Sequence, residues 1–589
     1  MRVMLLYPDI DTLTPIYYQL GVGSLAATLK AAGHEPRFER VPQLNRQKLM
    51  AAIKEFDPQL IGFSSVYVQW RYVRQMAAWI KEEHPVPTVA GGVHPTLSPD
   101  ECIAEPNMDF ICRGEGEHAL LDLVEAVSQG KPTDRIPNIW TRASDGRVIV
   151  NEMRELVDPL DSLPPPYREC LDYAKALRLQ YGNVQIMTSR GCPYRCTYCS
   201  NEAQMRLYSG NGRFIRQRSV ESVIDEIQGI VDRYPEEARY ITFSDDIITE
   251  NKKWLYAFLD EYKKRFDLPF NMQVQMQTFG RETARRLAEA GCYQAIIAIE
   301  SGDDYIRREV MNRNLTDEQI INTFRFCDEV GIETCSYNIV GVPGETEQSI
   351  QKSMDILRQA NPDHTLVFKF TPFPGTKLHE VCVSEGYLKE YEHDNYFSHV
   401  GFMDLPTISK QKLTELYYEF YRLGNQLSAM KRRQKMGSYY DFFEELPRAQ
   451  LRTSDPRYIN VELVRVDTDE RPSLLCHPDS EIRYRVTLKP NSVLRFGVTM
   501  APTVWSPDKG GPVKFRVEAR SMFRKRTLFE KQIDPKNNKD DRCWHDAEID
   551  LSSLAGKTVD LAFITKAPGS PEYCSSYWGE PIIVSRAAN

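Results

Sequence analysis

Three cysteines lie close together in the segment SRGCPYRCTYCSN, where Cys192, Cys196 and Cys199 have the spacing C-x3-C-x2-C. Thiolate is the ligand type of iron–sulfur clusters, and a cubane cluster contains four irons. Three thiolates would therefore leave one iron open to a small molecule. The amino and carboxylate groups of an amino acid could chelate that iron and place a sulfonium beside an electron donor. Reduction of the sulfonium would then break a carbon–sulfur bond and release a carbon radical.

A zinc site is the alternative interpretation of these cysteines. Three cysteines and a histidine can close a tetrahedral zinc site. Zinc motifs usually come as paired C-x2-C knuckles, however, and no histidine lies near this segment. The spacing therefore favours an iron–sulfur cluster over zinc.

A second series of strands and helices must position the cysteine segment. Strand candidates are residues 240–246, 272–278, 295–302, 335–344 and 365–373, and helical patterns cover residues 219–234, 281–291 and 317–331. About six strands with intervening helices predict a partial (β/α)6 barrel, with function at the C-terminal ends of the strands. We assign residues 184–405 to this barrel.

Residues 1–145 also alternate apolar runs, such as VMLLY and LIGFSSV, with amphipathic stretches. This alternation predicts a Rossmann-like domain with a parallel sheet and helices on both faces. Gly91, Gly92, Gly114 and Gly116 follow predicted strands, at the sheet edge where ligands usually bind, although tight turns would also explain each glycine. Residues 146–183 contain the proline-rich stretch DSLPPPYREC and are predicted to form a stiff linker.

Two further parts complete an α/β multidomain chain. Residues 406–450 are predicted to be a short helical extension, with helix over 408–446. Its basic run is interpreted as a solvated helix face rather than a nucleic-acid or substrate contact; the run consists of Lys431, Arg432, Arg433 and Lys435. Residues 451–589 alternate apolar and polar residues with period two, which predicts a C-terminal antiparallel β-sandwich.

Composition and charge limit the class of protein. The 589 residues are 42% hydrophobic and carry a formal net charge of −8, which argues against general nucleic-acid binding. The N-terminal sequence lacks the features of a secretory signal. No apolar run reaches the roughly 20 residues of a membrane span. Thirteen mostly isolated cysteines do not indicate a disulfide framework, so we expect a cytoplasmic protein.

The cysteine motif resembles that of the radical S-adenosylmethionine (SAM) superfamily, in which an aromatic residue precedes the third cysteine, as Tyr198 does here. Three more segments resemble that family: YITFSDDIIT, AIIAIESG and NIVGVPGETEQSI. The resemblance implies that Asp245 and Asp246 hold the SAM amino group. It also implies SAM contacts further along the barrel: Glu300 and Ser301 would face the ribose and carboxylate, and Val342 and Pro343 would line the adenine site.

Residues 1–440 resemble the superfamily branch that carries an N-terminal cobalamin-binding domain. The matching segments are YYQLGVGSLAATLKAAGHE, VAGGVHPTLSPDE and CRGEGEHAL. The resemblance implies a cobalamin site at the sheet edge, formed by Ser64, Gly91, Gly92, His94, Gly114 and Glu115. Tyr67, Gln69 and Trp70 could reach the upper cobalt face, although core packing explains Trp70 almost as well. His94 alone is interpreted as a supporting or structural histidine rather than a cobalt ligand.

The segment after the first predicted strand differs from the pattern of many cobalamin-binding domains. Many such domains have D-x-H-x-x-G there, with a histidine that ligates cobalt from below, whereas this chain has DIDTLTP. Members of the radical SAM branch often lack the histidine too. Lower cobalt coordination favours transfer of the methyl group as a radical.

The resemblance implies a cobalamin-dependent methyltransferase that forms a 5′-deoxyadenosyl radical from SAM and methylates an unactivated carbon. Its cofactors would be a [4Fe-4S] cluster, SAM and cobalamin, with a flavodoxin- or ferredoxin-type electron donor. Alternatives are ring formation or contraction, oxidative cyclisation or carbon–carbon coupling without methyl transfer. A protein of another class, a metal-stabilised binder with a glycan-binding sandwich, is a third hypothesis. Trp505, Trp544 and Trp578 could stack on a glycan-like substrate, but core packing is favoured.

Overall fold

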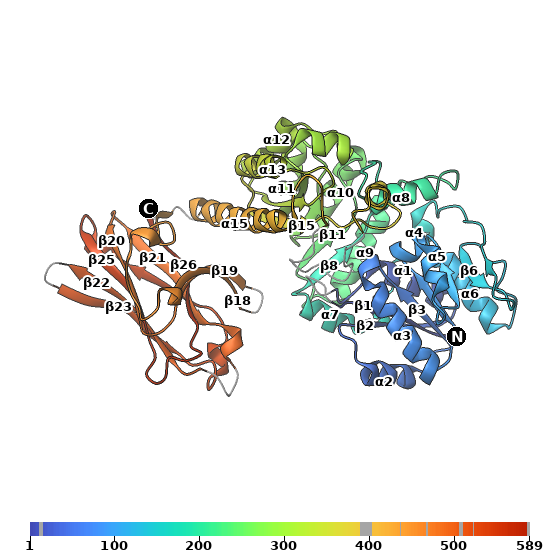
Figure 1. Ribbon diagram of the computed structural model, residues 1–589, viewed down its shortest axis with the longest axis horizontal. Coiled ribbons are helices and arrows are strands. Elements are labelled where there is room, and N and C mark those ends of the chain that lie inside the picture. Colours follow the sequence, from blue (N-terminus) through green and yellow to red (C-terminus); the bar gives the residue numbers. More distant parts are fainter. Residues whose placement is uncertain are drawn as a thin grey trace. The chain divides into compact units, whose positions relative to one another are not determined.

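The computed structural model describes residues 1–10, 16–388, 403–435, 438–466, 469–505, 510–521 and 524–585. The chain divides into two compact units, Met1–Leu427 and Ser428–Asn589 (Figure 1). Among the described residues, no helix is long and apolar enough to cross a membrane. The division of the chain into five parts stays a prediction.

The first unit begins with a seven-stranded sheet in the order β2-β1-β3-β4-β5-β6-β7. Its first five strands are parallel, and β6 and β7 extend it antiparallel. The strands are β1 (Arg2–Pro8), β2 (Glu35–Val41), β3 (Leu60–Ser64), β4 (Thr88–Gly91), β5 (Phe110–Cys112), β6 (Ile139–Arg142) and β7 (Val148–Ile149). The helices are α1 (Leu20–Ala31), α2 (Arg46–Phe56), α3 (Trp70–Glu83), α4 (Val93–Leu97), α5 (Pro99–Ala104) and α6 (Glu117–Ser128).

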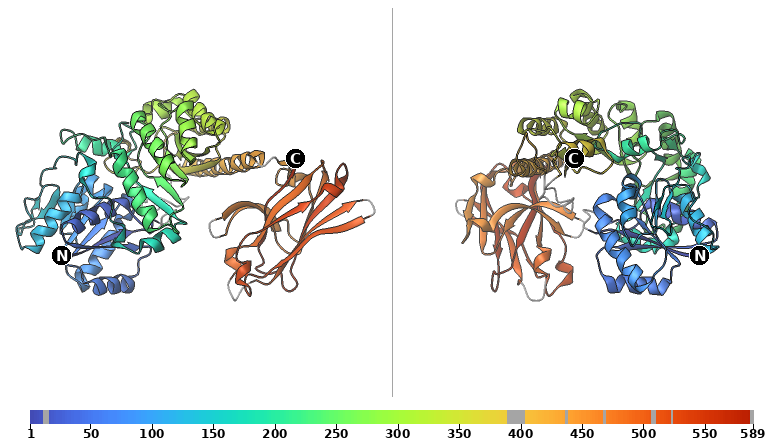
Figure 2. Two further views of the ribbon diagram at one scale, coloured as in Figure 1. Left: turned by 180° about the vertical axis from the view of Figure 1, so that it is seen from behind. Right: turned by 45° about the vertical axis from the view of Figure 1, so that its right-hand side comes forward.

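Side chains of β1 alternate between two cores, one on each face of this sheet. Met4 and Leu6 pack in a core with Ile53 of α2. Leu5 packs in the other core with Leu123 of α6. A strand buried on both faces is apolar without alternation, which explains the run VMLLY. Figure 2 shows helices on either side of this sheet.

A six-stranded parallel sheet, in the order β15-β14-β13-β12-β11-β8, forms the open barrel. Its strands are β8 (Asn183–Ile186), β11 (Tyr240–Phe243), β12 (Phe270–Gln273), β13 (Cys292–Glu300), β14 (Glu333–Val340) and β15 (His364–Lys369). The helices between them are α9 (Val220–Arg233), α10 (Lys252–Arg265), α11 (Arg281–Glu289), α12 (Asp317–Glu329) and α13 (Glu347–Ala360). Because every strand runs in the same direction, their C-terminal ends lie at one rim of the barrel.

Short elements connect the two sheets and complete the barrel rim. The linker contains η2 (Leu160–Ser162), η3 (Arg168–Cys170) and α7 (Tyr173–Leu179). Near the cysteines lie the paired strands β9 (Ser189–Arg190) and β10 (Arg216–Gln217), and helix α8 (Ser200–Leu207). The remaining short elements are η4 (Ile306–Val310) and α14 (Lys377–Ser384). The 26-residue helix α15 (Lys410–Lys435) begins in the first unit and ends in the second.

The second unit contains two antiparallel sheets around an aromatic core. One has the order β18-β19-β26-β21-β24, with β16 also paired to β26, and the other β17-β20-β25-β22-β23. The strands are β16 (Ser438–Asp441), β17 (Gln450–Arg452), β18 (Ile459–Val466), β19 (Asp469–Cys476), β20 (Ser480–Thr487), β21 (Ser492–Met500), β22 (Val513–Ser521), β23 (Arg524–Ile533), β24 (His545–Asp550), β25 (Thr558–Lys566) and β26 (Ser576–Ser585). Trp578 is fully buried in this core, while Trp505 and Trp544 pack partly buried against it. Core packing therefore accounts for the three tryptophans.

Two details of the predicted helical extension are wrong. Helix α15 ends at Lys435, and β16 begins at Ser438, because the aromatic segment after the helix pairs with β26. The basic run is not a uniformly solvated face, since Lys431 is buried and Arg432 forms an ion pair with Glu580. The side chain of Arg433 lies outside the described residues.

Candidate active site

The three clustered cysteines lie on the cluster loop, which we define as residues 189–199, between β8 and α8. Cys192, Cys196 and Cys199 are half-buried, whereas nine of the other ten cysteines are buried and Cys543 is exposed. Burial raises the pKa of Cys192 to about 12, and the neighbouring thiols of Cys199 and Cys196 also raise it, so the three sulfurs lie near one another. The loop therefore presents a set of thiols that no core packing requires.

The three thiols suit a cubane cluster. Each thiolate of a cubane binds a different iron, so three cysteines can hold three irons and leave the fourth open. Among the described residues, the structure groups no three Cys, His, Asp or Glu side chains into a site for one metal ion.

Tyr198 and Glu300 meet beside the cluster loop. The Tyr198 hydroxyl donates to Glu300 Oε1 at 3.0 Å and accepts from Arg313 Nη1 at 3.0 Å. Burial raises the pKa of Glu300, although Arg313 and Tyr198 oppose the rise. Ser301 is fully buried, and its hydroxyl accepts a hydrogen bond from the Asp303 amide at 3.3 Å. Glu300 thus lies close to the cysteines, while Ser301 holds the loop that follows β13.

The acidic pair at the end of β11 is divided between two environments. Asp245 is buried and accepts hydrogen bonds from the Thr188 amide at 3.0 Å and from the Ser189 hydroxyl. Burial raises its pKa to about 6 despite these bonds. Asp246 is exposed, and its charge raises the pKa of Cys192. Asp245 therefore anchors the start of the cluster loop. Burial raises the pKa of Asp246, and a hydrogen bond with Asn201 opposes that rise. Asp246 is the more exposed carboxylate of the pair.

Val342 and Pro343 lie in the loop after β14 and are buried. The carboxylate of Glu345 holds this loop, because it accepts from the amides of Gly341 at 2.6 Å and Val342 at 3.1 Å. Burial raises the pKa of Glu345 to about 8. Contact of Val342 and Pro343 with adenine stays a prediction.

A cavity of about 490 Å³ joins the edge of the N-terminal sheet to the barrel. Five of the residues predicted to bind cobalamin line it: Ser64, Gly91, Gly92, Gly114 and Glu115. One part is apolar and lies among Leu5, Val89 and Leu120. The barrel side adds Gln185, Met187, Ser189, Arg190, Arg218 and Ser244. An apolar slot that opens onto polar groups suits a large cofactor with a flat base and amide-bearing ring, so these residues fit cobalamin.

Gly92 and Gly114 let the backbone form this wall. Gly114 has φ +88°, and a Cβ there would lie 1.9 Å from the Tyr208 hydroxyl oxygen. Gly92 has φ +103°, and a Cβ there would lie 2.6 Å from the Ser65 carbonyl oxygen. Both turns need glycine. Other residues rarely adopt a positive φ angle, and a side chain at either position would collide with the neighbouring oxygen atom.

Four residues predicted near cobalamin do not line the cavity. His94 is buried, with its ring centroid 5.2 Å from that of Tyr67 and 5.5 Å from that of Trp70. Gln69 is buried and forms a hydrogen bond with Tyr7, which does line the cavity. Packing explains these positions, and direct cobalamin contact by any of the four stays a prediction. No histidine is among the described cavity residues, and residues 11–15 of the DIDTLTP segment lie outside the described part.

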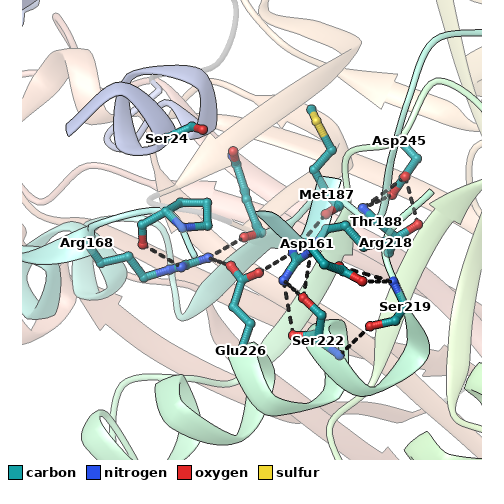
Figure 3. Close-up of polar contacts among 12 residues, drawn as sticks. Ser24, Asp161, Arg168, Met187, Thr188, Arg218, Ser219, Ser222, Glu226 and Asp245 are labelled. Carbon is teal, nitrogen blue, oxygen red and sulfur yellow. Dashed lines mark hydrogen bonds and ion pairs between the residues drawn. The ribbon is translucent and has the colours of Figure 1, made fainter. Parts of the chain in front are cut away.

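The linker, predicted only to be a connector, forms part of the cavity wall through Pro164, Pro165 and Pro166. The buried Arg168 holds it, because its guanidinium donates to the carbonyls of Pro166 at 3.2 Å and Gln185 at 3.1 Å. Figure 3 shows Arg168 and Arg218 on either side of the Glu226 carboxylate. The proline run Pro164, Pro165 and Pro166 was the available sequence signal for this wall, whereas the burial of Arg168 appears only in the structure.

Charged groups missed at the sequence level connect the cavity to the cluster loop. Arg190 forms ion pairs with Glu117 at 2.6 Å and Glu115 at 3.0 Å. Arg216 also pairs with Glu115 at 2.9 Å. The Glu115 carboxylate is therefore occupied by arginines, although the residue lines the cavity.

Comparisons with known families agree with this architecture. The model of the radical SAM superfamily matches residues 186–357, and that of the B12 binding domain matches residues 8–124. The first range contains the cluster loop, and the second contains most of the N-terminal sheet and its cavity residues.

Two relatives and one solved structure match more than half of the chain. An uncharacterized methyltransferase of Pyrococcus horikoshii is 29% identical over 381 residues, 63% of this chain and 80% of the relative. The cytidylyl-2-hydroxyethylphosphonate methyltransferase of Streptomyces wedmorensis is 24% identical over 487 residues, 72% of this chain and 89% of the relative. The structure of the radical SAM methyltransferase TsrM from Kitasatospora setae, with cobalamin and a [4Fe-4S] cluster bound, has a TM-score of 0.57 at 19% identity and covers 72% of this chain and 88% of that one. The chain therefore belongs to the radical SAM enzymes that carry an N-terminal cobalamin-binding domain.

Proposed function

We propose that this enzyme transfers a methyl group to an unactivated carbon of its substrate, with SAM, a [4Fe-4S] cluster and cobalamin as cofactors. One continuous cavity supports this proposal most directly. It reaches from Ser64 and Gly91 of the N-terminal domain to Gln185 and Ser244 of the barrel, and Arg190 of the cluster loop lines it. A cofactor in this cavity would lie against the rim from which SAM chemistry starts.

The chain's own residues would bind and orient the reactants. Cys192, Cys196 and Cys199 would hold the cluster, and the exposed Asp246 would accept a hydrogen bond from the SAM amino group. Glu300 would face the SAM ribose beside Tyr198. When bound, the cluster would supply the electron that cleaves SAM, and cobalamin would supply a cobalt that carries methyl.

Two relatives bear the name methyltransferase, which supports methyl transfer. A relative from Rubrivivax gelatinosus, 25% identical over 414 residues, is instead named a cyclase, so ring formation is the rival reaction that the experiment must separate. Fold alone would not separate these outcomes, because function depends on the site. Radical SAM enzymes also need a reductant, and we propose a flavodoxin- or ferredoxin-type donor. Thirteen free cysteines and a cluster suit a reducing compartment, so we propose the cytoplasm.

Label transfer from SAM tests the proposal. The enzyme would be reconstituted anaerobically with iron, sulfide and cobalamin, then incubated with reductant, methyl-labelled SAM and a fractionated metabolite extract. We expect 5′-deoxyadenosine, S-adenosylhomocysteine and one labelled product, and we expect both 5′-deoxyadenosine and the labelled product to be absent with Cys196→Ala. A product that forms together with deoxyadenosine but never carries the label would contradict methyl transfer.

A further inference from the structure

Arg190 lies where the cluster loop meets the N-terminal sheet. It stands two residues before Cys192 and lines the cavity. Its Nη2 atom is 2.6 Å from Glu117 Oε1, and its Nη1 atom is 3.0 Å from Glu115 Oε1. One guanidinium therefore connects the cluster loop to the segment Gly114–Glu117, which forms the opposite wall.

The environment of Glu117 makes this contact specific. Glu117 is the first residue of α6, and its carboxylate also accepts from the Ser24 hydroxyl of α1 at 2.7 Å. A helix N-terminus stabilises negative charge. Burial opposes ionisation, but Arg190 and Ser24 lower the pKa of Glu117 to about 2. The pair is thus ionised and largely hidden from solvent, with only 5% of the Glu117 side chain exposed.

A second arginine of the cavity provides a contrast. Arg218 also lines the cavity, but its guanidinium bonds to the Met187 carbonyl, Ser222 and Glu226. All these partners belong to the barrel. Arg218 shapes the cavity from one side, whereas Arg190 connects the two sides.

We propose that Arg190 is a positioning residue that couples occupancy of the cobalamin cavity to the conformation of the cluster loop. The inference rests on the proposed function for the identity of the two cofactors. A ligand that fixes the Gly114–Glu117 wall would restrict Arg190 and, through two peptide units, Cys192. A cluster that fixes the loop would restrict the same wall, because coupling between two sites is reciprocal.

Cobalamin affinity, measured with and without the cluster, tests this coupling. Hydroxocobalamin would be titrated anaerobically into cluster-free and cluster-containing full-length protein, and Kd obtained from absorbance or equilibrium dialysis. We expect the cluster to tighten cobalamin binding in the wild type by about fivefold or more. The ratio of the two Kd values should fall towards one in Arg190→Met, because the direct link from the cluster loop to Glu117 is lost and only the neighbouring Arg216–Glu115 pair remains.

Arg218→Met is the matched control. It also removes a cavity arginine, so both of its Kd values are expected to rise while their ratio stays at the wild-type value. Because Arg218 is one of the two arginines paired with the buried Glu226, urea unfolding of this variant is measured alongside, and the Kd values are compared under conditions in which it is folded. If Arg190→Met does not fold, Glu117→Gln provides a second test, since it removes the charge that Arg190 binds but keeps an acceptor for Ser24. Arg190→Lys should give an intermediate ratio, because one ammonium cannot reproduce the planar fork that spans both carboxylates.

The results separate this inference from the proposed function. Two results would overturn the coupling and leave the methyltransferase proposal intact. The first is an equal Kd for cobalamin in cluster-free and cluster-containing wild-type protein. The second is a ratio of these two Kd values that is the same in Arg190→Met as in the wild type. Wild-type protein that binds no cobalamin in either form would overturn both.

Discussion

The guanidinium of Arg168 lies 2.8 Å from the carboxylate of Glu226, and both side chains are almost completely withdrawn from solvent. Arg168 also holds the linker carbonyl of Pro166 and the β8 carbonyl of Gln185. This pair therefore joins the linker, the strand β8 and the helix α9 beside the cavity, which Pro166 and Gln185 line.

Arg168→Met is expected to lower the free energy of unfolding by about 3–5 kcal/mol, because Glu226 would lose one of the two arginines that compensate its buried charge. Urea unfolding followed by circular dichroism would measure this change. Arg178→Met is the control, since Arg178 pairs with Glu237 at the surface, where an exposed pair contributes about 0–1 kcal/mol. Equal effects of the two substitutions would contradict a structural role for the buried pair.

Gly114→Ala is expected to reduce cobalamin loading strongly. The new methyl group would meet the Tyr208 hydroxyl and displace the cavity wall. Gly210→Ala separates this clash from backbone strain, because Gly210 also has positive φ, +93°, but no atom within 4 Å of an added Cβ. Both substitutions incur roughly 1–2 kcal/mol of strain, and only Gly114→Ala should lower the cobalamin content of purified protein. Cobalamin absorbance per polypeptide gives the comparison.

The buried carboxyl of Glu345 predicts a pH-dependent stability. Its pKa of about 8 in the folded protein exceeds the ordinary value of 4.5, so the folded state favours the protonated form. This contribution is present at low pH and is lost as pH rises from about 4.5 to 8, by about 3 kcal/mol between pH 4.5 and 7. Glu345→Gln should lack that part of the slope when unfolding is measured across this range. A variant with the same slope as the wild type would assign the pH dependence to other groups.

Replacement of any one of Cys192, Cys196 and Cys199 by alanine is expected to abolish the stable cluster, because each thiolate would bind a separate iron. Iron and sulfide content after anaerobic reconstitution measures this loss. Cys543→Ala should retain the wild-type content, since Cys543 is exposed in the second unit. A wild-type protein that contains zinc and no sulfide would contradict the cluster.

Local patterns predicted much of the fold. The apolar run of β1 and the barrel segments were recognisable because parallel strands covered on both faces must be apolar. Strands β6 and β7 were missed, although Asp145 and Gly146 between them are a hairpin signal.

The candidate site could be predicted only where residues act within one motif. The spacing of the cysteines is local, and so is the turn at Gly114. The contact between Arg190 and Glu117 joins residues 73 positions apart, and no local pattern indicates which distant charges meet. The tertiary fold alone brings these charges and the linker prolines to one cavity.

The cavity draws its walls from a long stretch of sequence, from Leu5 near the N-terminus to Ser244 after β11. Domains generally fold in N-terminal order during synthesis. The N-terminal sheet can therefore form on the ribosome while only its own side of the cavity exists. The other side forms when the linker and the barrel strands β8 and β11 have emerged from the ribosome. The cofactor can then be enclosed only after synthesis has passed Ser244.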